Sequence, residues 1–399
     1  MNLDIAQLPP RCDVLVVGAG PAGSAAATAL ARAGRDVVLV DQRSFPREKV
    51  CGDGLIPDAH AALARLGVLE EVMARAQRAS HVGCIAPRGG RVDVPGRLAV
   101  LPRRELDDIV CRNAVRAGAR MFAPVHFDAP LTDTAARVCG ARLSHGGELR
   151  EVYADWVLLA TGAGPQALLA AGVCERQAPS AVALRAYVKN VAQAERIKAL
   201  EVVWHRKLRP GYGWIFPCAE GVFNIGVGVF GHEKEDVNLK HLFESFCEFY
   251  EPARELMAGG ERLGPLKGAP LRCTLDGARY SRPGLLVTGE AAGSTYAFTG
   301  EGIGKALETG LLAAEALVSK RSDADVRRGY EQSLRTLRPR FQLYERANRV
   351  NAHPWLVDLL IWRARKSERL VRRMAGVLEE TSNPAQLLSA KGVFRLFTE

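Results

Sequence analysis

Residues 14–41 read VLVVGAGPAGSAAATALARAGRDVVLVD. The apolar runs 14–17 and 37–40 are typical of buried parallel strands, and the alanine-rich segment between them is typical of a helix. Gly18, Gly20 and Gly23 fall where such a unit turns tightly, lets its backbone approach a pyrophosphate, and packs its helix on the strand. Asp41 ends the second strand, where a carboxylate can accept from ribose hydroxyls. The stretch predicts a βαβ unit that binds a dinucleotide; the alternative is an empty βαβ unit.

Composition indicates a globular protein. The chain has 399 residues, 48% of them hydrophobic, which is enough for about two to three domains with full cores. No apolar run approaches the roughly 18 residues that span a bilayer, and the N-terminus lacks a signal-peptide pattern. The nine cysteines are scattered without a CxxC pair, and the eight histidines do not cluster. We therefore expect a cytoplasmic protein without a metal.

The positive charge is concentrated near the C-terminus. The net charge is +10, and residues 327–373 hold thirteen Lys and Arg against four acids. Within this stretch lies the apolar, helix-like segment PWLVDLLIW, residues 354–362. It could lie on an anionic membrane surface, or it could pack its apolar side on the protein while its arginines are solvated. No nucleic-acid-binding module is recognisable, so nucleic acid is not an expected partner.

Buried strands of the nucleotide-binding type recur along the chain, with β-rich segments between them, at 14–17, 37–40, 156–160 and 285–288. This interleaving predicts an α/β fold in which a discontinuous Rossmann-type domain carries an inserted antiparallel β-sheet domain. We assign the nucleotide-binding domain to 1–80, 101–176 and 276–325, the inserted substrate-binding domain to 81–100 and 177–275, and a basic, helical C-terminal region to 326–399. Helices are expected at 57–66, 101–119 and within 238–260, and a hairpin at 82–100.

A second glycine cluster follows the last buried strand, with TGEAAG at 288–293 and TGEGI at 299–303. Such small residues let backbone approach a flat ring. The helix that follows would aim its first amides at negative charge on that ring. The alternative is a glycine-rich loop without a ligand.

Several of these features together resemble flavoproteins of the aromatic-hydroxylase type. They are the glycine turn with Asp41, Arg103 four residues before Asp107, the strand end Ala160-Thr161-Gly162, and GEAAG. That group usually has Asp at the position of Glu290, and an acid directly after the ATG segment that this chain lacks. The resemblance implies FAD, with Arg104 as the alternative to Arg103. The residues implied to bind it are Gly18, Gly20, Ala22, Gly23, Asp41, Gln42, Lys49, Cys51, Gly52, Arg103, Ala160, Thr161, Gly162, Gly289, Glu290, Gly300, Gly302 and Ile303.

Two further segments resemble the geranylgeranyl reductase family, and the resemblance covers about residues 12–320. KVCGDGL at 49–55 is similar to a loop of that family. YGWIFP at 212–217, followed after eight residues by GVG at 226–228, fits its YxWxFP…GxG signature. On a strand, Tyr212, Trp214 and Phe216 share one face and could form an aromatic wall beside a long apolar substrate; ordinary sheet core is the alternative.

The resemblance also implies roles for single residues. The catalytic candidates are Cys51, Tyr212 and Trp214, and the substrate-binding candidates are Tyr212, Trp214, Phe216 and Pro217. The Cys51 thiol could supply a proton or sense the redox state of the pocket, or it could simply line the pocket.

The implied activity is FAD-dependent reduction of carbon–carbon double bonds in a prenyl chain, either a geranylgeranyl lipid or the tail of an isoprenoid quinone. A flavin monooxygenase or hydroxylase acting on an aromatic or polyketide-like substrate is the main alternative. A membrane-associated flavin-binding protein without catalysis is a third. The sequence has no second complete GxGxxG unit, so NAD(P)H docking transiently or a reduced ferredoxin-like protein would supply electrons. Peripheral contact with the inner face of the membrane would involve the basic C-terminal region.

Overall fold

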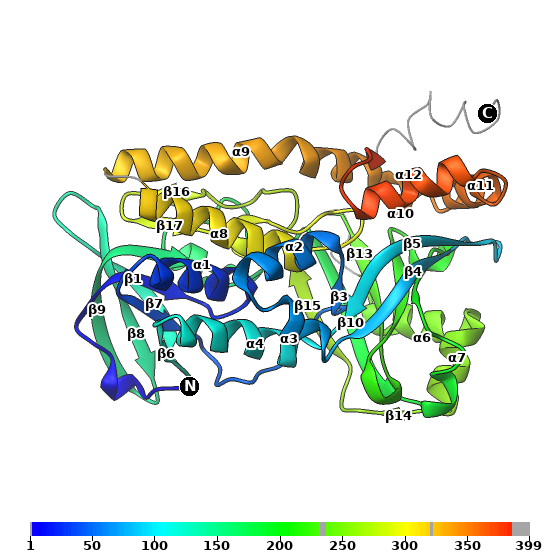
Figure 1. Ribbon diagram of the computed structural model, residues 1–399, viewed down its shortest axis with the longest axis horizontal. Helices are drawn as coiled ribbons and strands as arrows, with labels where there is room; N and C mark the ends of the chain where they lie inside the picture. The colour runs from blue at the N-terminus through cyan, green and yellow to red at the C-terminus, as the bar shows by residue number, and fades with distance from the viewer. Residues whose placement is uncertain (1, 232–236, 320–321, 385–399) are drawn as a thin grey trace.

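The predicted βαβ unit forms the centre of the first sheet in the computed structural model, which describes residues 2–231, 237–319 and 322–384. The strand order is β16-β17-β9-β1-β2-β6, and segments far apart in sequence lie side by side (Figure 1). This arrangement confirms an interleaved, Rossmann-type α/β fold. The elements are β1 (Arg11–Val17), α1 (Pro21–Arg32), β2 (Val37–Val40), β6 (Arg120–Phe122), β9 (Glu148–Leu159), β16 (Ser281–Arg282) and β17 (Leu285–Val287).

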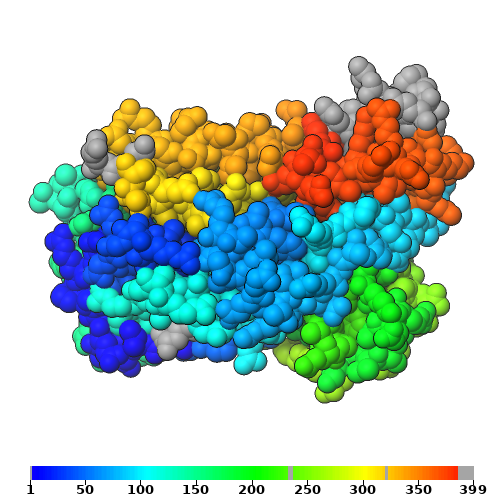
Figure 2. All heavy atoms as spheres, in the orientation of Figure 1, coloured from blue at the N-terminus to red at the C-terminus, as the bar shows by residue number. Residues whose placement is uncertain are grey.

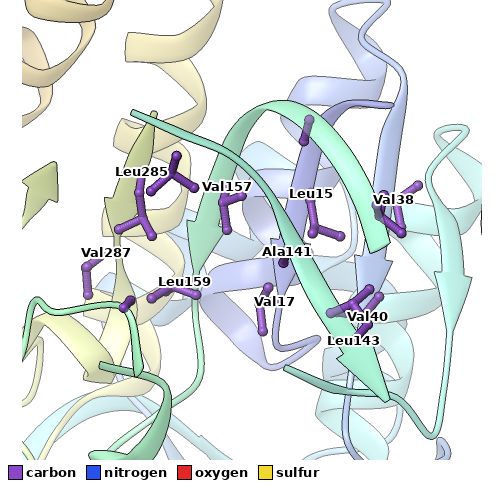
Figure 3. Packing of buried hydrophobic residues seen from close by; sticks show 14 of the residues in the cluster. Leu15, Val17, Val38, Val40, Ala141, Leu143, Val157, Leu159, Leu285 and Val287 are labelled. Atoms are coloured by element: carbon purple, nitrogen blue, oxygen red, sulfur yellow. The ribbon is translucent and has the colours of Figure 1, made fainter. Parts of the chain in front are cut away.

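Two hydrophobic cores cover the two faces of this sheet, as the continuous apolar strands require. One face packs against α1 and three further helices, namely α4 (Arg103–Arg116), α8 (Ile303–Ser319) and α9 (Asp323–Ala347). The other face is covered by an antiparallel extension of β9 and by a short helix. These elements are β7 (His126–Thr132), β8 (Val138–His145) and α5 (Gln166–Ala170). Figure 3 shows this second core, where Leu15 and Val17 of β1 meet Ala141 and Leu143 of β8.

The second sheet has the order β14-β10-β13-β12-β11-β4-β5-β3, with β15 pairing to β10. Its pairs are antiparallel among the described strands except β4 with β11, which is parallel. Two helices, α6 (Leu239–Phe249) and α7 (Glu251–Ala258), pack on one face. The strands are β3 (Gly54–Leu55), β4 (Gln77–Ile85), β5 (Arg91–Val100), β10 (Ala181–Lys189), β11 (Leu200–Val203), β12 (Gly211–Pro217), β13 (Val222–Phe230), β14 (Glu261–Arg262) and β15 (Lys267–Leu271).

The predicted hairpin at 82–100 is formed by β4 and β5. Residues 54–55 and 77–80, which we assigned to the nucleotide-binding domain, contribute strand to the second sheet. The proposed division into domains stays a prediction.

The described part of the C-terminal region is helical; α9 packs on the first sheet, and the helices after it roof the second sheet. In Figure 2 the orange-red atoms of α11 (Trp355–Ala364) and α12 (Glu368–Leu378) lie over the cyan β4–β5 hairpin. Val357 and Ile361 are buried in the core of the second sheet, whereas Trp355 and Trp362 are exposed. The basic, helical region was expected to extend over 385–399 as well, and these residues lie outside those that the structure describes. The helix between α9 and α11 is α10 (Arg349–Ala352).

Shorter helices complete the fold. Two α-helices, α2 (Pro57–Leu66) and α3 (Leu69–Met73), follow β3, and α2 has the predicted bounds. Within the described ranges, no helix is long and apolar enough to cross a bilayer. The short 3-10 helices are η1 (Ile5–Gln7), η2 (Val191–Gln193), η3 (Arg206–Leu208), η4 (Ala219–Gly221) and η5 (Gly289–Ala292).

Candidate active site

A cavity of about 1080 Å³ is lined by both sheets and by the C-terminal helices. The carboxyl ends of β1 and β2 and the start of α1 line one part of it, where Gly18, Gly20 and Asp41 lie. Crevices at the carboxyl ends of parallel strands are where open α/β sheets bind ligands. The glycine turn therefore opens on a space large enough for a cofactor and a second ligand.

The three glycines of the turn differ in their surroundings. A Cβ on Gly18, whose φ is +102°, would lie 2.4 Å from the carbonyl oxygen of Ala160, and a Cβ on Gly23 would lie 1.8 Å from that of Gly18. The nearest atom to a Cβ on Gly20 is Nη2 of Arg47 at 3.5 Å. Gly20 is also the N-cap of α1, and no side chain caps this helix. First-turn amides facing an open space fit the pyrophosphate of a dinucleotide.

Asp41 lies in the cavity wall with both carboxylate oxygens fixed. Oδ2 accepts from the amide of Ala19 at 2.9 Å, and Oδ1 accepts from the amide of Arg43 at 3.0 Å. The guanidinium of Arg47 approaches Oδ1 to 3.5 Å. A carboxylate held at the end of β2 in this way fits a ribose.

Arg103, rather than Arg104, reaches the cavity. Its side chain is buried and donates to both oxygens of Asp107, at 2.6 and 2.8 Å, whereas Arg104 is exposed. Arg47 also contacts Asp107, at 3.0 Å. The buried carboxylate thus holds two cations at the side of the glycine turn.

The late glycine cluster packs against the first one. Gly289 has a φ of +67°, and a Cβ there would lie 2.5 Å from Cβ of Ala22 in α1. Glu290 lines the cavity, 3.9 Å from Nζ of Lys49. The Thr161 hydroxyl also lies in the cavity wall, buried and without a partner among the described residues. An orphaned hydroxyl beside free helix amides is a further sign that a polar ligand belongs here.

Tyr212, Trp214 and Phe216 form one aromatic wall of the cavity. Neighbouring ring centroids are 6.4 and 6.3 Å apart. On β13, Gly228 lies opposite Tyr212 and Gly226 lies opposite Trp214. A Cβ on Gly226 would lie 2.3 Å from the indole ring, so this glycine of the GxG segment makes room for Trp214.

Most of the residues predicted for the site lie in the cavity wall, and three do not. Gly23 and Gly289 lie behind the wall, where they allow close packing around α1. Pro217 follows Phe216 on β12, so strand alternation turns it to the other face of the sheet. The roles of the wall residues remain proposals.

Asp53 is a site residue that sequence reasoning missed. It is fully buried, has a φ of +66°, and accepts from the Tyr187 hydroxyl, from Nδ2 of Asn224 at 2.7 Å and from the amide of Arg103 at 3.2 Å. The Asn224 amide also donates to the carbonyl of Cys51, at 2.7 Å. One carboxylate therefore fixes the 49–54 loop on the second sheet. The sequence feature that could have indicated this network is the polar Asn224 in the otherwise apolar strand VFNIGVGVF.

Burial decides the protonation of this loop. It raises the pKa of Asp53 to about 6, against the opposing effect of the hydrogen bonds from Tyr187 and Asn224. Burial also raises the pKa of the Cys51 thiol, and the charge of Arg103 offsets part of this effect. At neutral pH Cys51 is therefore a thiol that carries a proton, not a thiolate nucleophile.

The rest of the cavity is an apolar chamber beneath the C-terminal helices. Its lining comes from the β4–β5 hairpin and from α11 and α12, which contribute Val82, Val94, Leu98, Leu360, Ile361, Met374 and Leu378. The contribution of α11 and α12 was not expected, because these helices lie beyond the part of the chain that carries the family resemblance. Such a chamber suits a long apolar ligand.

A dinucleotide turn that opens on an aromatic wall and an apolar chamber is the arrangement of an FAD-dependent oxidoreductase. Family comparison agrees, since residues 11–215 match the model of an FAD binding domain. Residues 180–259, which include the aromatic wall, match the geranylgeranyl reductase catalytic domain. The chain belongs to the geranylgeranyl reductase family of FAD-dependent oxidoreductases.

Related proteins extend the similarity over most of the chain. A menaquinone reductase of Mycolicibacterium smegmatis is 35% identical over 326 residues, 77% of each chain. A digeranylgeranylglycerophospholipid reductase of Methanopyrus kandleri is 31% identical over 312 residues, 76% of each chain.

Solved structures share the fold. A geranylgeranyl bacteriochlorophyll reductase-like protein from Thermoplasma acidophilum matches with a TM-score of 0.77 and 21% identity, covering 98% of this chain and 96% of its own. A flavin-dependent brominase also matches with a TM-score of 0.77, at 19% identity, covering 96% of this chain and 99% of its own. At these identities the likeness shows the fold alone.

Proposed function

We propose that this oxidoreductase saturates carbon–carbon double bonds in a prenyl chain, either of a geranylgeranyl lipid or of an isoprenoid quinone tail. The observation that carries the proposal is the continuity of one cavity from the glycine turn to the apolar chamber under α11 and α12. The names of the relatives, a menaquinone reductase and a digeranylgeranylglycerophospholipid reductase, support the same class of substrate.

The residues of the site have distinct tasks in this proposal. The amides at the start of α1 hold the pyrophosphate, Asp41 holds the ribose, and Glu290 holds the ribitol chain. Bound FAD, once reduced, supplies hydride. Tyr212, Trp214 and Phe216 orient the prenyl chain and exclude water. The Asp53 network holds Cys51 and its loop against this wall, where the thiol lines the reacting part of the cavity.

The electron donor is proposed to be external. Within the described residues, one strand–turn–helix unit carries the GxGxxG pattern, and it is needed for FAD. Electrons therefore come from NAD(P)H that docks transiently or from a reduced ferredoxin-like protein.

We further propose that α11 brings the cavity to a membrane surface. Trp355 and Trp362 are 60% and 49% exposed, seven residues apart and thus on one face of the helix. The next segment carries the exposed cations Arg365, Lys366, Arg369 and Arg372. Aromatic side chains beside cations are typical of peripheral contact with anionic lipid.

A single turnover tests the reaction. Dithionite-reduced protein is mixed with geranylgeranyl and quinone lipids, without oxygen and again in air, and the products are identified by mass spectrometry. We expect a gain of two hydrogens in the anaerobic sample. Oxygen gained only in air would identify a hydroxylase, and no product in either sample would contradict the proposed substrate class.

A further inference from the structure

Glu301 occupies a fixed position in the cavity wall. It lies in the turn before α8, where its carbonyl accepts from the amide of Tyr296 at 2.8 Å. The preceding Gly300 has a φ of +71°, and a Cβ there would lie 2.8 Å from the hydroxyl of Tyr212. That hydroxyl donates to the carbonyl of Thr299. The turn is therefore pressed against the aromatic wall, and Glu301 adjoins the space proposed for the prenyl chain.

The other carboxyl groups that line the cavity already have donors. Asp41 and Asp53 accept from backbone amides, Glu48 is paired with Lys267, and Glu290 lies near Lys49 and the Thr295 hydroxyl. Glu301 has no ion pair within the part of the chain that the structure describes. Among these carboxyls it is thus the one for which the described residues supply neither an ion pair nor a backbone-amide donor.

The surroundings of Glu301 favour the protonated form. Burial, and after it the negative charge of Asp58, raises the pKa of Glu301 to about 8, and the Thr299 hydroxyl and the charge of Lys305 offset part of this effect. An acid donates best when its pKa is near the working pH. At neutral pH Glu301 keeps its proton and can release it more easily than Cys51, whose pKa lies above the ordinary value of 9.0.

A buried ion cluster behind Glu301 maintains this preference. Lys305 is 2% exposed, and its Nζ lies 3.6 Å from Asp58, 2.7 Å from Glu308 and 2.9 Å from Glu380. Arg340 also pairs with Glu380, so three carboxylates face two cations, and the remaining negative charge opposes ionisation of Glu301. The charged and titratable groups that influence Glu301 or are influenced by it are Asp58 of α2, Lys305 of α8, Glu380 after α12, Tyr212 of β12 and Tyr344 of α9.

We propose that Glu301 is the catalytic acid that protonates the double bond, and that Asp58 is a positioning residue that acts through it. This inference rests on the proposed reductase function. As the π bond breaks, one carbon receives a hydride, with its electron pair, from the reduced cofactor. The other carbon forms its new C–H bond with the proton of Glu301. The carboxylate that remains takes a proton from water before the next turnover.

Substitution of Glu301 by Gln tests the proposal, because it keeps the shape and removes the proton. We expect Glu301→Gln to bind FAD with wild-type affinity, measured by flavin fluorescence, and to reduce the substrate about 100-fold more slowly or worse. In the wild type the rate should fall as the pH rises through about 8, where Glu301 loses its proton. Asp58→Asn should move this fall to lower pH, since it removes a negative charge. Glu315→Gln, an exposed carboxyl on α8 away from the cavity, is the matched control with an unchanged rate and profile.

A second measurement does not depend on turnover. An infrared titration of the cofactor-free protein should show a carboxyl group that ionises near pH 8 in the wild type and is missing in Glu301→Gln. If Glu301→Gln is unstable, Glu301→Asp replaces it and should retain the fall in rate at alkaline pH with slower reduction. Wild-type turnover by Glu301→Gln, or no such carboxyl group, overturns the role of Glu301. Failure of the wild type to reduce any prenyl lipid overturns the proposed function instead.

Discussion

Gly18, Gly20 and Gly23 of the GxGxxG pattern are required for different reasons. Gly18 and Gly23 are required by the protein itself, because a side chain at either would overlap a backbone carbonyl. Gly20 has ordinary space around it and an extended backbone that any residue can adopt. Its lack of a side chain leaves room for the proposed pyrophosphate to approach the start of α1 from the cavity.

Because Gly20 has free space and Gly23 does not, we expect a substitution at Gly20 to affect FAD binding and one at Gly23 to affect stability. Gly20→Val should fold with the stability of the wild type but purify without yellow colour, because the new side chain fills the pyrophosphate site. Gly23→Ala should lower the stability of the protein even without FAD, by about 1–3 kcal/mol as for other overpacked sites. Flavin content and urea unfolding of the cofactor-free proteins provide the two measurements. A yellow, fully loaded Gly20→Val protein would contradict the placement of the cofactor.

Among single residues of the site, the sequence predicted those that belong to a recognisable local pattern. The glycines, Asp41 and the alternating aromatic residues belong to this group. The Asp53 network could not be found in this way, because Tyr187 and Asn224 are 134 and 171 residues away along the chain. No local periodicity reports a hydrogen bond between such distant segments, nor the burial that raises a pKa.

At the scale of elements, the pairing of β12 with β13 explains a signature that covers both strands. Two of the large rings on β12 lie opposite glycines of β13, and the third, Phe216, lies opposite Asn224. Gly228 and Gly226 lie opposite Tyr212 and Trp214, and Oδ1 of Asn224 accepts from the indole N–H of Trp214 at 2.9 Å. The spacing of the signature is thus the register of the strand pair.

This register predicts a graded response to added side chains on β13. Gly226→Ala should push the ring of Trp214 into the cavity, since its Cβ would lie 2.3 Å from the indole. We expect a loss of stability of about 1–3 kcal/mol and a larger KM for a prenyl substrate. Gly228→Ala is the milder control, because its nearest contact is the ring of Phe230 at 3.3 Å. Equal effects of the two changes on unfolding and on KM would contradict the role given to Gly226.

Most helices and strands could be predicted from periodicity, and the way they pair could not. The helix at 57–66 and the hairpin at 82–100 follow from local pattern alone. The parallel pairing of β4 with β11 joins two segments more than a hundred residues apart, and both strands line the cavity. The helical C-terminal region was predicted, but its place as the roof of the cavity was not.

At the scale of the whole molecule, α11 has one face toward the substrate chamber and another toward solvent. Ile361 and Leu360 line the cavity, whereas Trp355 and Trp362 are exposed. The sequence offered two alternatives for this segment, packing on the protein or contact with an anionic membrane. The apolar side of α11 packs on the protein, and its two exposed tryptophans remain for contact with a membrane.

Vesicle flotation tests this surface. The protein should float with vesicles rich in phosphatidylglycerol at low salt and less with phosphatidylcholine, because cations near an anionic surface contribute about 1 kcal/mol each. The double variant Trp355→Ser, Trp362→Ser should lose most of this binding. Tyr153→Ser removes an aromatic residue that is 48% exposed on β9 and serves as the matched control. Undiminished flotation of the double variant would contradict the role of α11.

The interleaved strand order also constrains how the protein is made. As the chain leaves the ribosome, β1, β2, β6 and β9 emerge long before β17, which pairs with β9. During that interval β9 has an unpaired edge, a feature that promotes aggregation. The segments η5 and α8, which line the cavity proposed to hold the flavin, arrive later still, and the helices α10–α12 arrive last. The first sheet is therefore completed only by the final third of the chain, and no cut in the middle yields two complete sheets.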